Sequence, residues 1–140
     1  YFAVDRDCTV DASSFILEVG HSVNITAGDE VELKEAVYSQ PVSVAFQVAD
    51  DFTDIGTGVY TSTVCQNGPS DVNHAVLAVG YGHDDDSDLD YWLIKNSWGT
   101  EWGDAGFFKI ERGVNMCGIA QCNSYPDSVS EITTPTLEVF

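Results

Sequence analysis

The sequence predicts an α+β fold that consists mainly of antiparallel strands with one or two short helices. Runs of β-branched and aromatic residues outnumber the helical patterns, and turn-forming residues separate them. The length of 140 residues suits one ordinary domain with a sizeable core, and 44% hydrophobic residues is normal for a globular protein. The spacing of the strand candidates fits a closed or half-closed antiparallel sheet.

The first part of the chain predicts one strand and one helix. Residues 1–9 form a loop anchored only by Cys8, and residues 13–25 alternate loosely, as a strand running into a turn does. Asp29 can cap a helix over residues 30–39, which has acidic residues in its first turn and ends before Pro41. The apolar helix residues available to the core are Val31, Leu33, Ala36 and Val37.

The remainder predicts four strands. A β-branched and aromatic run covers residues 42–48, and an acidic turn and a glycine-rich approach to Tyr60 follow it. Residues 75–81 and 91–95 are apolar strand candidates joined by a polar loop over residues 82–90, and residues 107–111 form another candidate.

The charge of the chain excludes some classes of partner. Twenty-three acidic and five basic residues give a formal net charge of −18, so no basic surface is available for nucleic acid or for an anionic membrane. Such acidity is typical of a very soluble or salt-adapted protein, or of one that works in an acidic vesicle, where protonation relieves self-repulsion. No segment reaches the length of a membrane span, and no signal segment opens the chain.

Two motifs place a chemically capable residue in an apolar or aromatic setting. His74 lies within residues 71–82, and Asn96 lies within residues 91–103, two residues before Trp98. Imidazole can take a thiol proton and later protonate a leaving amine, while an asparagine oxygen can fix the ring tautomer under an aromatic roof. A lone histidine in a strand is usually a core residue, but this combination favours catalysis by His74 and Asn96. A nucleophile segment of the Cys-Gly-Ser-Cys-Trp type does not occur in the chain.

These motifs closely resemble the C-terminal half of papain-like cysteine proteases, within that family the cathepsin H and aleurain group. The resemblance covers residues 1–126 and includes residues 24–26, 40–46, 72–82 and 111–126. It implies the β-rich right-hand domain of the papain fold over residues 1–126, with residues 127–140 as an extension of unknown role. A helical left-hand domain that carries the nucleophilic cysteine would complete the fold.

The resemblance further implies thiol-dependent hydrolysis of peptides without a cofactor or metal. Carried over by position, the residues that line the substrate pocket are Ala45, Val72, Ala75, Trp98 and Cys122. Trp102 is either a packing residue behind Trp98 or a part of the leaving-group side of the cleft.

The cysteines divide by the same resemblance. Cys65 and Cys117 correspond to a disulfide within the right-hand domain, and Cys8 to a half-cystine bonded to the left-hand domain. Cys122 matches the cysteine that tethers a propeptide remnant in cathepsin H, where the remnant makes the enzyme an aminopeptidase. A free, buried thiol is the alternative for Cys122.

Four cysteines and the sequon Asn24-Ile25-Thr26 suggest an oxidising secretory route, with a glycan on Asn24. Together with this route, the resemblance implies a location in the lysosome or the vacuole, or outside the cell.

Alternative interpretations remain open for the acidic loop 83–90 and for the function of the chain. The acidic loop 83–90 has carboxylates at spacings that suggest calcium, but Leu89 and Lys95 occupy the positions where an EF-hand needs glycine and glutamate, so a solvated hairpin tip is favoured. His21 and His83 show no partner pattern. The competing functional hypothesis is a non-enzymatic relative whose other half lacks the cysteine, and it rests on the unusual charge and on the apolar end of the tail.

Overall fold

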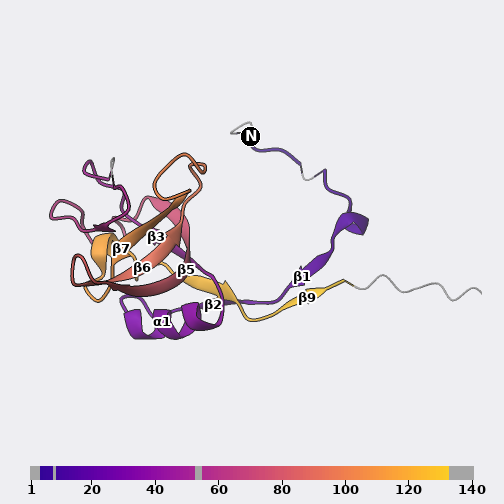
Figure 1. Cartoon of the computed structure of the whole chain (residues 1–140). Helices are drawn as coiled ribbons and strands as arrows, with labels where there is room; N and C mark the ends of the chain where they lie inside the picture. Colours follow the sequence, from indigo (N-terminus) through magenta and orange to yellow (C-terminus); the bar gives the residue numbers. More distant parts are fainter. Residues whose placement is uncertain (1–3, 8, 53–54, 133–140) are drawn as a thin grey trace, which may run out of the picture. The chain divides into compact units, whose positions relative to one another are not determined.

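The computed structural model describes residues 4–7, 9–52 and 55–132 (Figure 1). Its contacts divide the chain into two compact units. The larger unit comprises residues 22–125, and the smaller comprises residues up to 21 together with those from 126 onward.

The larger unit contains a seven-stranded sheet with the strand order β2-β8-β3-β5-β6-β7-β4. Strands β2, β3, β5, β6 and β7 of this sheet are labelled in Figure 1. The strand bounds are β2 Ser22–Asn24, β3 Val42–Phe46, β4 Val59–Tyr60, β5 His74–Asp84, β6 Leu89–Lys95, β7 Phe107–Glu111 and β8 Ser124–Pro126. The β3–β5, β5–β6, β6–β7 and β3–β8 pairs are antiparallel, whereas β4 and β7 run parallel. The prediction of a mainly antiparallel α+β fold is therefore confirmed.

One face of this sheet forms the core. Along β3 the side chains of Val42, Val44 and Phe46 are buried, while the intervening Ser43 and Ala45 are not. The register continues this row across the sheet, since Val44 lies opposite Val76 and Ile94 lies opposite Phe108. The alternation separates an inner face, which packs into the core, from an outer face that is open to other contacts.

Helix α1, Glu30–Ser39, begins and ends where the sequence predicts. The Asp29 carboxylate accepts hydrogen bonds from the backbone N–H groups of Val31 and Glu32, at 3.0 and 2.9 Å. Leu33, Ala36 and Val37 join the core as expected. The expectation for Val31 is wrong: it is 71% exposed, because it lies on the opposite side of the helix from Leu33, Ala36 and Val37.

The β5–β6 hairpin is longer than the sequence predicts. Residues 82–84 and 89–90, expected in a loop, belong to strands in which His83 pairs with Asp90 and Asp84 with Leu89. The loop is thus reduced to residues 85–88. The polar side chains of this stretch concealed its strand character, because the alternation of apolar residues ends before the pairing does.

The smaller unit is a two-stranded ribbon. Strand β1, Leu17–Val19, pairs antiparallel with β9, Val129–Glu131, and a short 3-10 turn, Ala12–Ser14, precedes β1. Strand β9 lies within the stretch that the sequence assigned to a C-terminal extension, of which residues 133–140 lie outside the described residues.

A disulfide joins Cys65 to Cys117, as predicted. Cys117 is buried in a second 3-10 turn, Met116–Gly118. In the part of the chain that the structure describes, every helix is too short or too polar to cross a bilayer.

Candidate active site

The ends of two neighbouring strands bring His74 and Asn96 together. His74 is the first residue of β5, and Asn96 directly follows β6. Because the strands are antiparallel, the start of one lies beside the end of the other. The pair Leu77–Lys95 is the last in register at this end, and continuing that register places Trp98 opposite His74.

The side chains of His74 and Asn96 are in direct contact. The Nε2 atom of His74 lies 2.9 Å from Oδ1 of Asn96, which also accepts a hydrogen bond from the backbone N–H of Ser97 at 2.8 Å. An amide oxygen only accepts hydrogen bonds, so this contact selects the ring tautomer with a proton on Nε2. Nδ1 is then the atom that can receive a proton. Asn96 is 8% exposed and His74 is half-buried, so the amide is fixed and the ring stays accessible.

Trp98 covers the histidine. The two rings stack with 5.1 Å between centroids and 29° between planes. The Trp102 ring packs edge-to-face against Trp98, with 4.9 Å between centroids, and also packs on the core residue Phe108. Trp102 therefore supports Trp98 from the side of the core. The packing interpretation of Trp102 therefore fits the structure better than a place in the cleft.

Glycines shape the loop that carries both tryptophans. Asn96 N–H donates to the carbonyl of Gly106 at 2.9 Å, which closes the loop at its base. Gly103 has φ +59°, and a Cβ built there would lie 2.5 Å from the carbonyl oxygen of Phe107. Only glycine fits this turn without a shift of backbone.

Two of the residues assigned to the substrate pocket, Ala45 and Ala75, lie on the outer face of the sheet. Ala45 lies directly opposite Ala75, and Ser43 lies opposite Ser124. Continuing the second register by two residues places Cys122 opposite Ala45. Val72 precedes this row and packs on the backbone of Gly118, where an added Cβ would meet Val72 at 3.1 Å. Ala45, Ala75 and Cys122 thus lie in one row, and Ala75 directly follows His74.

Phe52 supports the site, although the sequence analysis did not select it. It is 2% exposed and lies under the tryptophans, with centroids 5.8 Å from Trp98 and 5.7 Å from Trp102. The Tyr60 ring contacts Phe52 edge-on at 4.9 Å, and its hydroxyl donates to Asp51 at 2.7 Å. Burial raises the pKa of Tyr60 to about 12, while the hydrogen bond from Tyr60 lowers the pKa of Asp51. An acidic turn before Phe52 gave no local signal of this role.

The other predicted positions have separate locations. Asn24 is exposed at the end of β2, and Cys122 is a free, exposed thiol, so the alternative of a buried thiol is wrong. Cys8 lies outside the described residues. Within residues 4–7, 9–52 and 55–132, no group of three or more His, Cys, Asp or Glu side chains is arranged to hold a metal ion.

His21 and His83, which show no partner pattern in the sequence, each contact a carboxylate in the structure. His21 Nδ1 lies 3.5 Å from a carboxylate oxygen of Asp127, and His83 Nδ1 lies 3.0 Å from Asp90. The His21 pair joins residues 106 positions apart, which no local pattern reveals.

Comparison with known proteins gives a consistent result. The family model described as papain family cysteine protease matches residues 1–127. Pro-cathepsin H of Medicago truncatula is 61% identical over 120 residues, which cover 85% of this chain and 34% of that protein. The aleurain-like thiol protease of Arabidopsis thaliana is 58% identical, with 90% and 35% covered, and pro-cathepsin H of Mus musculus is 50% identical, with 90% and 38% covered.

Comparison with solved structures also finds proteases. The digestive procathepsin L2 proteinase of Tenebrio molitor matches with a TM-score of 0.81 and 40% identity, over 90% of this chain and 39% of that one. The bromelain protease of Ananas comosus, in complex with the E64 inhibitor, matches with a TM-score of 0.69 and 35% identity, over 77% and 50%. The chain spans about a third of the length of the curated relatives described above.

Proposed function

Because this chain belongs to the papain family of cysteine proteases, we propose that it supplies the base and the orienting amide of a thiol-dependent peptidase. The observation that carries the proposal is the 2.9 Å contact between His74 and Asn96 beneath the stacked ring of Trp98. The nucleophile would be a cysteine in the N-terminal half of the family fold, which this chain does not contain.

The proposed reaction is acyl transfer. With Nε2–H held by Asn96, Nδ1 of His74 takes the thiol proton, and the resulting thiolate attacks the carbonyl carbon of the peptide. His74 then gives this proton to the departing amine as the C–N bond breaks. In the second half-reaction His74 removes a proton from water, which attacks the thioester, and the thiol is regenerated as the acid product leaves. The Trp98 roof excludes water that would compete for the His74–Asn96 hydrogen bond.

We propose peptides as substrates, received on the outer face of the sheet. Ala45, Ala75 and Cys122 in one row, with Val72 beside them, leave room for an apolar side chain. Trp98, which is 44% exposed, would provide a wall of the same cleft.

The finer proposal is aminopeptidase action. Cys122 would bind a propeptide remnant through a disulfide, and the exposed thiol of Cys122 supports this because it is open to a partner. The carboxylate at the end of the remnant would receive the free amine of a substrate, which favours removal of single N-terminal residues. The test is the intact mass before and after reduction: release of a short peptide supports the tether, and no release speaks for an ordinary endopeptidase. Cys122→Ser should raise endopeptidase activity.

The remaining assignments follow from the family. Residues 1–126 would form the right-hand domain and residues 127–140 an extension, with Cys8 bonded to the left-hand domain. Asn24 would carry a glycan, which its exposure permits. The location would be the lysosome or vacuole, or outside the cell, and the acidic composition suits an acidic compartment.

The decisive experiment measures thiolate reactivity in the complete protein. Alkylation by iodoacetamide at mildly acidic pH should be rapid, should be lost in His74→Ala, and should weaken less in Asn96→Ala, because orientation contributes less than proton transfer. His21→Ala, which alters a histidine outside the site, is the matched control. If no thiol reacts in the unmodified protein, the chain belongs to a non-enzymatic relative. If a thiol reacts equally in His74→Ala, the assigned role of His74 is wrong.

A further inference from the structure

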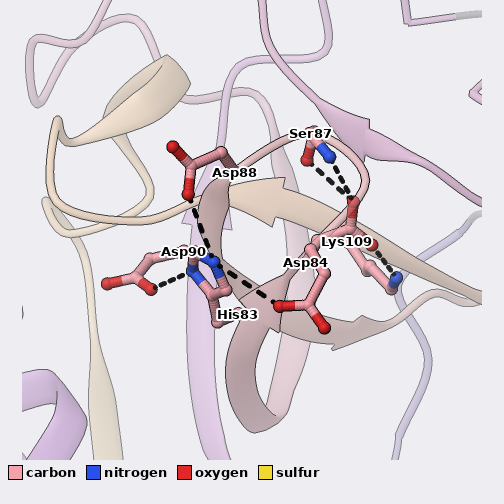
Figure 2. Close-up of polar contacts among 7 residues, drawn as sticks. His83, Asp84, Ser87, Asp88, Asp90 and Lys109 are labelled. Carbon is pink, nitrogen blue, oxygen red and sulfur yellow. Dashed lines mark hydrogen bonds and ion pairs between the residues drawn. The ribbon is translucent and has the colours of Figure 1, made fainter.

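The tip of the β5–β6 hairpin carries a second cluster of ionisable side chains (Figure 2). His83 lies nine residues after His74 on the same strand. At about 3.3 Å per residue the two histidines are separated by roughly 30 Å. The cluster therefore needs an explanation other than the peptidase chemistry.

Both ring nitrogens of His83 face carboxylates. Nδ1 lies 3.0 Å from Asp90, and Nε2 lies 3.5 Å from Asp88 and 3.9 Å from Asp85. A neutral imidazole has a proton on only one nitrogen, so its other nitrogen would direct a lone pair at a carboxylate. The imidazolium donates from both nitrogens. The arrangement therefore fits the protonated ring and disfavours the neutral one.

The other basic side chains near the tip form ion pairs with Asp84 and Asp90. Lys109 of β7 contacts Asp84 at 2.7 Å, and Ser87 donates to the same carboxylate at 2.8 Å, as Figure 2 shows. Arg112, which follows β7, contacts the second oxygen of Asp90 at 2.7 Å, and Lys34 of α1 acts on Asp90 from a greater distance. Among the described residues, the basic side chain in ion-pair contact with both Asp85 and Asp88 is His83.

We propose that His83 is a pH-sensitive latch that holds the hairpin tip, residues 85–88, at mildly acidic pH and releases it when the ring loses its proton. Release follows because Asp85, Asp88 and Asp90 then lose the positive charge that they share. Of these three carboxylates, Asp90 keeps its contact with Arg112. Asp88 is also the point of backbone strain in the tip, with φ +55°, a conformation that a non-glycine residue adopts at some cost.

The direction of the pH effect follows from the contacts. The hydrogen bond to Asp90 raises the pKa of His83 above its ordinary value of 6.5, so the latch is fully formed below that pH and is lost as the pH rises through the higher folded value. The hydrogen bond from His83 lowers the pKa of Asp90 below 3.8. The Asp90 carboxylate therefore becomes protonated, and loses its attraction to the charged ring, only at a more acidic pH. The tip is thus held between these two limits.

The test is amide hydrogen exchange of residues 83–90 in the complete protein, at about pH 5 and about pH 8, each corrected for the intrinsic exchange rate at that pH. We expect protection of the tip to fall at the higher pH in the unmodified protein and to be low and independent of pH in His83→Gln. His21→Gln is the matched control, because His21 is an exposed histidine that contacts a single carboxylate, and it should retain the pH response.

A second measurement leaves His83 itself unchanged. In the NMR titration of the unmodified protein, the His83 ring should change charge at a higher pH than it does in Asp88→Asn. A His83 midpoint at or below the ordinary value overturns the proposal, as does tip protection that responds to pH equally with and without His83. Neither measurement uses a group of the proposed peptidase site, so the two proposals can fail independently.

Discussion

The Cys65–Cys117 disulfide should contribute a large part of the stability of the larger unit. The two cysteines are 52 positions apart. In the chain-entropy model, a loop of this length removes about 14 cal/mol/K of entropy from the unfolded chain, which amounts to about 4 kcal/mol at 25 °C. Alanine at both positions removes the link without burying a new hydroxyl at Cys117, which is 1% exposed.

Urea denaturation measures this effect. We expect the double variant to lose about 4 kcal/mol of unfolding free energy and to show a larger m-value, because the unlinked denatured chain exposes more surface. Cys122→Ala is the control, since its thiol is free and exposed and its loss should leave the midpoint unchanged. A loss below about 1 kcal/mol with an unchanged m-value would refute the loop-entropy argument.

Three further predictions concern packing, capping and the turn beside the site. Phe52→Ala should cost about 3–5 kcal/mol and alter the fluorescence of Trp98, because it leaves a cavity under the roof; thermal denaturation with no loss of stability would contradict this. Asp29→Ala should cost about 1 kcal/mol in urea denaturation, whereas Asp29→Asn should cost much less, since the amide oxygen can still cap the helix; equal effects of the two variants would contradict the capping role. Gly103→Ala should destabilise the protein by more than about 1 kcal/mol, while Gly58→Ala, where an added Cβ meets nothing within 4 Å, should be nearly neutral. Equal melting temperatures for the two glycine variants would contradict the close approach to Phe107.

Local signals made much of the larger unit predictable. Helix α1 has its cap, its acidic first turn and its terminating proline within a short stretch of sequence, and the strand over residues 107–111 matches β7 at both ends. The contact between His74 and Asn96 could also be predicted from the sequence, because two strands joined by a short connection are normally neighbours.

Long-range partners account for what the sequence did not predict. At the end of the β5–β6 hairpin, Asp84 and Asp90 contact Lys109 and Arg112, which lie on another part of the chain and give no signal in the sequence of the hairpin itself. Strands β1 and β9 are three residues each and pair across more than a hundred positions, so neither has a pattern of its own. Phe52 follows an acidic turn and is recognisable only through the five aromatic rings around it.

The arrangement of His74 and Asn96 on a single hairpin also has a consequence for the order of folding. Strands β5 and β6 are joined by only four residues, so their pairing is a local event that costs little loop-closure entropy. The β1–β9 pairing, by contrast, must wait for two segments more than a hundred positions apart to meet. We therefore expect pulse-labelling during refolding to protect the β5 and β6 amides in the earliest phase. The histidine and its asparagine would then be neighbours before most of the molecule has reached its native structure.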